Sequence, residues 1–174
     1  IFQEDCISTV GVGFSFKEVT LKDGTKIKLK LIDTAGQEKY RSIAKSYYKN
    51  ADGVLFVFAY DNKESFDHIE EWFKSFKENG KKEDIPMILI GNKIDVKKEE
   101  EIIKNESIEE LKKKIGINNF SGTSAKENIG IENVFNEISE EMYEKNKDRI
   151  KKSQSKLKLM DEKALFKDRN KDKC

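Results

Sequence analysis

The sequence has little of what extracellular, membrane-spanning or zinc-binding proteins depend on. Its two cysteines, Cys6 and Cys174, exclude a disulfide framework and indicate a reducing compartment. It has no apolar run of about 18 residues, the length that a membrane span needs, and no signal-peptide pattern opens it. The single histidine, His68, has no cysteine or second histidine near it in the sequence, which argues against a zinc site. The 174 residues, 36% hydrophobic and 39% charged, suit one compact domain with a lean core.

Charge is balanced overall but unevenly distributed. The chain has 34 basic and 33 acidic residues, which gives a net charge of +1. This balance excludes a strongly basic nucleic-acid-binding protein, and we expect no nucleic-acid partner. Residues 145–174 contain 12 Lys or Arg against 5 Asp or Glu, whereas residues 1–144 contain 22 against 28. A basic tail after an acidic body favours contact with an anionic surface. The alternative is a solvated, disordered tail with no partner.

The first part of the chain predicts two antiparallel strands. Residues 10–21 alternate apolar and polar side chains, the pattern of a half-buried strand, with apolar positions at Val10, Val12, Phe14 and Phe16. Asp23-Gly24 is a strong hairpin-turn signal. A second alternating segment follows at Ile27, Leu29 and Leu31.

The rest of the body predicts buried strands that alternate with helices. Residues 53–60 and 85–90 are continuous apolar runs, typical of strands in a parallel sheet covered on both faces. Helical spacing lies between them, where Trp72, Phe73 and Phe76 are expected to be core residues, and again over 131–142. A weaker helical pattern covers 102–115. This order indicates an α/β layered fold.

Three polar loops each follow a predicted strand. They are Asp33-x-x-Gly36, Asn92-Lys93-Ile94-Asp95 and Thr123-Ser124-Ala125-Lys126. In an open parallel sheet, ligands sit beyond the carboxyl ends of the strands. The three loops are therefore expected to gather at one sheet edge and contact one ligand.

The side chains of these loops suit a guanine nucleotide with a magnesium ion. An Asp at a strand end, Asp33, can hold Mg²⁺ through water, and Gly36 lets a phosphate approach the backbone. The Asp95 carboxylate only accepts hydrogen bonds, so it matches the two adjacent N–H donors that guanine has and adenine lacks. Asn92 can donate and accept, the Lys93 stem can lie across a base, and the Ala125 N–H can donate to a base carbonyl. Each loop alone has the composition of an ordinary solvated turn; their order and context distinguish them.

These loops and several flanking segments together resemble a small GTPase of the Ras superfamily, most closely the Rab family. The similarity covers about residues 1–144. The residues that carry it are Ile7–Phe14, Lys30–Arg41 with the specific string Asp-Thr-Ala-Gly-Gln-Glu, Tyr47–Ala51, and the loops at 92–95 and 123–126.

The resemblance implies a fold and a division of the chain. The fold is α/β, a Ras-like P-loop NTPase of three layers, with a mostly parallel sheet and one antiparallel hairpin, here without its first strand and phosphate loop. Residues 1–144 would form the GTPase domain, truncated at its N-terminus, and residues 145–174 a basic variable C-terminal tail.

The resemblance also implies roles for single residues. Thr9 and Asp33 would ligate Mg²⁺, Gly36 would contact the γ-phosphate, and Gln37 would orient the attacking water as the catalytic residue. The nucleotide, GTP or GDP, would be read by the two base loops, with guanine contacts from Asn92, Lys93, Asp95 and Ala125 and support from Ser124 and Lys126.

The implied partners act through two switch segments, about 1–16 and 34–48, which would bind effectors, an exchange factor and an activating protein. Arg41 is the first arginine, so no arginine finger is built into the earlier switch residues, and intrinsic GTP hydrolysis is expected to be slow without an activating protein. The implied role is regulation of vesicle traffic from the cytosolic face of intracellular membranes.

One family feature is absent from the sequence. No Gly-rich loop ending in Gly-Lys-Ser or Gly-Lys-Thr occurs in the 174 residues. The chain starts at Ile1 rather than methionine, so we expect a truncated or processed piece of a longer GTPase, which as given would bind nucleotide poorly and be unstable. The rival interpretation is a Rab-like interaction module that binds no nucleotide and catalyses nothing.

The last residue, Cys174, leaves two interpretations open. Rab proteins usually end in two prenylated cysteines, and Cys-a-a-X is the other common ending; a single terminal cysteine fits neither well. Cys174 is either a lipidation site, with the basic tail as the second membrane signal, or a plain exposed thiol.

Overall fold

The computed structural model describes residues 9–36, 40–80, 84–96 and 102–149. The chain separates into two compact units, Ile1–Met142 and Tyr143–Cys174. In the second unit, the described residues 143–149 are helical and contain an ion pair between Lys147 and Glu144, with Nζ and Oε1 2.9 Å apart.

The predicted hairpin is confirmed. Strands β1 (Val12–Thr20) and β2 (Lys26–Thr34) pair antiparallel, from Val12 opposite Thr34 to Thr20 opposite Lys26. The turn needs the left-handed backbone of Gly24, whose φ is +82°. β2 continues two residues further than the sequence predicted, because the ladder extends through Asp33 and Thr34 and the Ala35 N–H then donates to the Gly11 carbonyl. Asp33 therefore lies within a strand rather than in the following loop.

The predicted parallel sheet is also confirmed. It contains β3 (Val54–Ala59), β4 (Met87–Asn92) and β5 (Phe120–Thr123), in the order β3-β4-β5. The hairpin and this sheet are separate, so within the described residues no strand pairs with both β2 and β3.

Four helical segments complete the described chain: α1 (Arg41–Tyr48), α2 (Lys63–Asn79), α3 (Asn105–Ile115) and the helical residues 131–149. No periodicity in the sequence indicated α1, which is short and contributes a single buried apolar side chain, Ala44. α2 begins at Asn62, whose side chain accepts a hydrogen bond from the Ser65 N–H and so satisfies one free helix donor. Among the described helices, none combines the length and the apolar character that crossing a bilayer requires.

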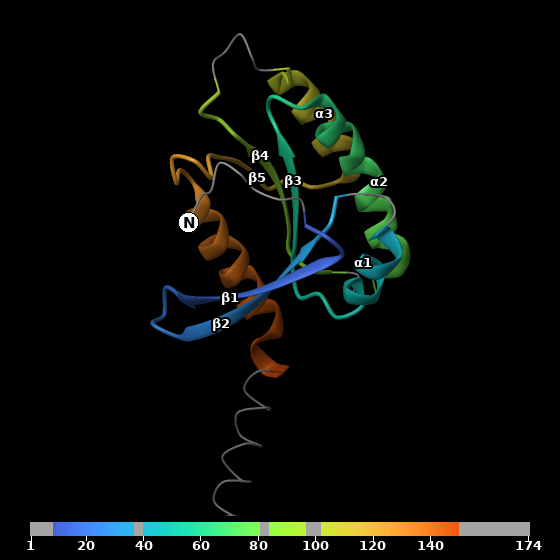
Figure 1. Ribbon diagram of the computed structural model, residues 1–174. Helices are drawn as coiled ribbons and strands as arrows, with labels where there is room; N and C mark the ends of the chain where they lie inside the picture. The colour runs from blue at the N-terminus through green and yellow to red at the C-terminus, as the bar shows by residue number, and fades with distance from the viewer. Residues whose placement is uncertain (1–8, 37–39, 81–83, 97–101, 150–174) are drawn as a thin grey trace, which may run out of the picture. The chain divides into compact units, whose positions relative to one another are not determined.

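Helices cover both faces of the parallel sheet, which makes three layers (Figure 1). Successive β4 side chains point to opposite faces. Leu89 packs with Ile69 of α2 and Ile108 of α3, and the cluster includes the expected core residues Trp72, Phe73 and Phe76. Ile88 and Ile90 pack on the other face with Val134 and Ile138 from the helix over 131–142. The α/β, Ras-like fold class expected from the sequence is therefore confirmed.

The hairpin is attached to the helix over 131–142 by polar contacts. The Lys17 ammonium lies 3.1 Å from the Glu132 carboxylate, and the Lys22 N–H donates to Glu140 Oε1 at 2.6 Å. Lys17 also lies over the Phe135 ring, 5.6 Å from its centroid. These contacts hold the β1–β2 hairpin beside the body although it shares no ladder with the sheet.

Substituting Gly130 by alanine tests how the last helix is joined to the sheet. Gly130 has φ +73°, and a Cβ there would lie 2.7 Å from the Gly122 carbonyl oxygen, whereas Gly116 has φ +69° and open space around it. We expect Gly130→Ala to lower the free energy of unfolding by about 2–4 kcal/mol, and Gly116→Ala by about 1–2 kcal/mol, because only the first adds a backbone clash to the left-handed strain. Urea denaturation of both variants measures the difference; equal losses would contradict the clash.

Candidate functional site

The first group of predicted residues lies where residues 9–13 run beside the end of β2. The Thr9 hydroxyl donates to Asp33 Oδ2 at 2.7 Å. Opposite Asp33 in the ladder is Gly13, where a Cβ would lie 3.6 Å from the Asp33 Cβ. The structure thus brings together the two residues predicted to hold Mg²⁺. Their hydroxyl and carboxylate oxygens are the hard ligands that this cation prefers, so the donor set fits.

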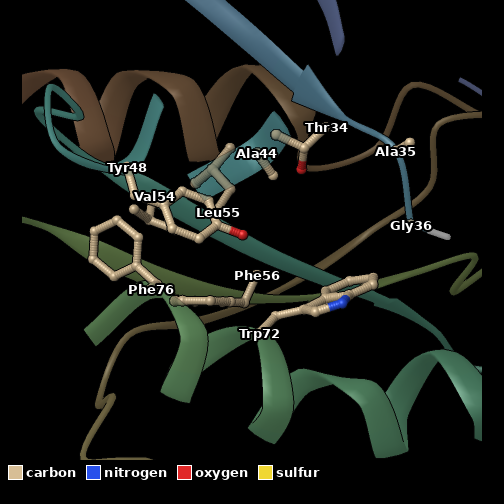
Figure 2. A pocket seen from close by; sticks show the side chains of 10 residues that line it. All are labelled: Thr34, Ala35, Gly36, Ala44, Tyr48, Val54, Leu55, Phe56, Trp72 and Phe76. Carbon is tan, nitrogen blue, oxygen red and sulfur yellow. The ribbon is translucent and has the colours of Figure 1, made fainter. Parts of the chain in front are cut away.

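Gly36 follows β2 and lies against α2. A Cβ at Gly36 would be 3.7 Å from Cη2 and Cζ2 of Trp72, an ordinary contact distance. The two residues share the lining of a pocket between the end of β2, α1, β3 and α2 (Figure 2). The backbone proposed to approach a phosphate therefore lines the same pocket as the single tryptophan of the sequence. The catalytic candidate, Gln37, lies outside the described residues.

The second group is organised by the side chain of Asn92. Because β4 and β5 are parallel with Asn92 opposite Thr123, the loops that follow them start side by side. Asn92 Oδ1 accepts two hydrogen bonds at 3.1 Å, from the Thr123 hydroxyl and from the Ala125 N–H. Thr123 is 2% exposed, so this contact is largely shielded from water. The sequence predicted that the Ala125 N–H donates to a base carbonyl; here its acceptor is Asn92.

Ser124 supports both the third loop and Asp95. Ser124 is fully buried, and its backbone exchanges two hydrogen bonds with Ile129, while its Oγ accepts from the Glu127 N–H at 3.0 Å. A hydrogen bond from the Ser124 side chain holds the pKa of Asp95 below its usual range, with smaller contributions from the Lys126 and Lys93 charges. Asp95 is exposed, so its acceptor-only carboxylate is open to solvent.

Lys93, in the loop after β4, has an ion-pair partner that the sequence did not single out. Its backbone is left-handed, with φ +67°, and its ammonium lies 2.8 Å from Asp61 Oδ2. Asp61 comes two residues after β3, so the rule that polar side chains just beyond strand ends form sites could have identified it. Thr123 and Trp72 are further contributors to which the sequence assigned no site role.

The arrangement therefore has two parts: an oxygen pair at Thr9 and Asp33, and the polar residues Asn92, Lys93, Asp95 and Ala125 of the two loops that follow β4 and β5. Lys126 is exposed at the end of the third loop. The candidate lipidation site, Cys174, lies outside the described residues. In the described ranges no cluster of three or more His, Cys, Asp or Glu side chains forms a metal-binding group.

Removing the Ser124 hydroxyl tests the cause of the lowered pKa of Asp95. In Ser124→Ala the pKa of Asp95 is expected to rise toward its ordinary value, because its largest stabilising hydrogen bond is lost. Since the folded-state pKa of Asp95 is below the unfolded one, its contribution to stability is present above the ordinary carboxyl pKa and disappears as pH falls through the folded pKa. Carboxyl NMR titration measures the shift. Ser107→Ala, on α3, is the matched control, and an unchanged Asp95 titration in Ser124→Ala would refute the assignment.

Comparison with known proteins places the chain in a family. The model described as Ras family matches residues 1–144. The chain is 38% identical over 144 residues to Ras-related protein Rab-8A of Bos taurus, covering 83% of this chain and 68% of that protein. It is 37% identical over 144 residues to Ras-related protein Rab-12 of Homo sapiens, covering 83% and 58%.

Ras-related protein Rab-26 of Rattus norvegicus is 38% identical over 139 residues, or 80% of this chain and 52% of that protein. The chain thus spans between about half and two thirds of the length of these relatives. The segments matched include both groups of site residues. The chain belongs to the Ras family and, within it, to the Rab small GTPases.

Proposed function

We propose that the protein is a guanine-nucleotide switch that binds GTP and GDP and hydrolyses GTP. The observation that carries the proposal is the junction of the β4 and β5 loops. There Asn92 Oδ1 accepts hydrogen bonds from the Thr123 hydroxyl and the Ala125 N–H, and a hydrogen bond from Ser124 lowers the pKa of Asp95. This junction supports a site for the edge of a guanine base.

The chemistry of the junction selects guanine over adenine. The Asp95 carboxylate can accept from the ring N–H and the amino group that guanine presents side by side. Asn92 Oδ1 is engaged inside the protein, so its amide nitrogen is the group available to donate to the base. Lys93 would cover one base face, and Ser124 and Lys126 would support the third loop.

Thr9 and Asp33 are the proposed magnesium ligands. Bound Mg²⁺ would neutralise charge on the β- and γ-phosphate oxygens. The Gly36 N–H would contact the γ-phosphate, and Gln37 would orient the attacking water. Loss of the γ-phosphate would then release the contacts at Thr9 and Gly36, which is the basis of the switch.

Effector proteins are proposed to bind the surface beside these contacts. Exposed apolar side chains gather in β1, β2 and α1, at Phe14, Phe16, Ile32 and Ile43, and Val10 precedes them. Phe14 contacts Tyr47 of α1 edge-on, with ring centroids 5.6 Å apart, which connects the two switch segments. The same segments would bind the exchange factor and the activating protein.

Residues 145–174 are proposed to act as a basic variable tail beyond a GTPase domain at 1–144. Their excess of 12 Lys or Arg over 5 Asp or Glu suits an anionic membrane surface. Prenylation of Cys174 would supply the second signal that stable anchoring needs. The proposed location is the cytosolic face of intracellular membranes, and the proposed process is vesicle traffic.

One observation favours a second candidate function. The 174 residues contain no Gly-Lys-Ser or Gly-Lys-Thr phosphate loop. A Rab-like interaction module that binds no nucleotide would need none. Titration of the intact protein with GDP separates the two candidates, because the module predicts no binding at any magnesium concentration.

Changing the Asp95 carboxylate to an amide tests the base assignment. Xanthine carries an oxygen where guanine carries its amino group, so Asp95→Asn replaces a favourable contact with guanine by one with xanthine. We expect GDP affinity to fall about 10–100-fold, the worth of hydrogen bonds to a charged group, and XDP affinity to rise. Competition against fluorescent GDP measures both. Asp67→Asn, an exposed carboxylate on α2, is the control; equal losses in the two variants would reject the assignment.

Trp72 offers a direct signal of the switch. Because Gly36 and the Trp72 indole line the same pocket, exchange of GDP for GTP with Mg²⁺ is expected to change the fluorescence of this single tryptophan, and hydrolysis to reverse the change. Gln37→Leu should slow the reversal by about 10-fold or more, since the attacking water loses its positioning group. Trp72→Phe removes the signal without removing hydrolysis. Reversal at the wild-type rate in Gln37→Leu would contradict the catalytic assignment.

A further inference from the structure

The ion pair between Lys93 and Asp61 joins the tips of two neighbouring strands. β3 ends at Ala59 and β4 at Asn92, and these two residues are opposite each other in the parallel ladder. The Tyr60 N–H donates to the Asn92 carbonyl at 3.0 Å and extends the pairing by one step. Asp61 and Lys93 follow immediately, with Oδ2 and Nζ 2.8 Å apart. The contact is therefore set by the strand register.

The backbone that carries Asp61 is held on both sides. The Asn62 N–H donates to the Ala59 carbonyl at 3.1 Å, and the Ala59 N–H donates to the Ser65 hydroxyl at 3.0 Å. The Tyr60 carbonyl accepts from the N–H groups of Ile102 and Ile103. Asp61 therefore presents its carboxylate from a fixed turn.

The backbone of Lys93 is equally constrained, which leaves its side chain as the variable part. The Ile94 N–H donates to the Thr123 carbonyl at 3.1 Å and the Val96 N–H to the Lys93 carbonyl at 3.2 Å. A lysine side chain has four rotatable bonds, and ordering it costs conformational entropy. With Nζ bound to Asp61, that ordering has already taken place before any ligand arrives.

The ion pair is a poor device for stabilising the fold. Its side chains are 49% and 30% exposed, the range in which such pairs add little to stability. The other oxygen, Asp61 Oδ1, is buried and has no hydrogen-bond partner among the residues that the structure describes. A buried acceptor without a donor is unfavourable. The Asp61 carboxylate thus destabilises the fold at Oδ1 and adds little stability at Oδ2. Stability of the fold does not account for this residue.

We propose that Asp61 is a positioning residue of the guanine site: it tethers the Lys93 ammonium so that the Lys93 stem is ordered before the base binds. This inference rests on the proposed function, in which Lys93 covers a base face. Pre-ordering a side chain raises affinity by removing part of the entropy lost on binding. A half-exposed ion pair of this kind corresponds to an effect of about 2–5-fold.

A double-mutant cycle with GDP and Mg²⁺ tests the proposal on the full chain. Asp61→Asn should weaken GDP affinity about 2–5-fold, and Asp61→Glu, which keeps the charge, should lose less. In a Lys93→Ala background Asp61→Asn should cause no further loss of GDP affinity, because the lysine side chain that Asp61 binds is absent. Asp67→Asn, which removes the exposed Lys63–Asp67 pair on α2 with its 2.9 Å separation, is the matched control and should leave affinity unchanged.

The outcomes separate this inference from the proposed function. If the intact wild-type protein binds no GDP, the proposed function fails and this inference fails with it. If the wild type binds GDP and Asp61→Asn has no effect, raises affinity, or weakens binding equally with and without Lys93, the tether alone is overturned. An equal loss in both backgrounds would mark Asp61 as merely structural.

Discussion

The side chain of Asn92 is the contact on which the candidate site depends. It lies at the last residue of β4, opposite Thr123, and its single carbonyl oxygen accepts from a nearly buried hydroxyl and from the backbone of the next loop. These two hydrogen bonds join residues that are 31 and 33 positions apart in the sequence. They therefore hold the loops after β4 and β5 together. Ser124, Asp95 and Lys93 are placed relative to one another because this junction holds.

The layered core explains why the strand tips can be polar. β4 is covered on both faces, by α2 and α3 on one side and by the helix over 131–142 on the other, so its side chains supply the apolar burial for both layers. Stability therefore comes from Ile88, Leu89 and Ile90 rather than from the loops. The residues just beyond the ends of β3 and β4 can therefore be charged, strained or incompletely hydrogen-bonded, as Asp61 and Lys93 are.

The two groups of candidate site residues, Thr9 with Asp33 and the residues around Asp95, suit ligands of different charge. At Thr9 and Asp33 a hydroxyl and a carboxylate lie together and suit a hard cation. At Asp95 a hydrogen bond from a buried serine and two nearby lysines favour the ionised form, which suits neutral N–H donors of a base. The two groups of residues therefore offer different chemistry: oxygen ligands at Thr9 and Asp33, and an acceptor-only carboxylate at Asp95.

The sequence alone predicted most of the elements and the candidate site: alternation at 10–21 predicted β1, apolar runs predicted β3 and β4, and the three polar loops supplied the candidate site residues. These signals are local, so they can be read without coordinates. The tertiary structure alone decided that Asn92 binds Thr123 and Ala125, that Trp72 lies against Gly36 and that Asp61 holds Lys93. It also revealed α1, which has no strong periodicity of its own. Such contacts join residues far apart in sequence through strand register and helix packing, and no local pattern encodes the register.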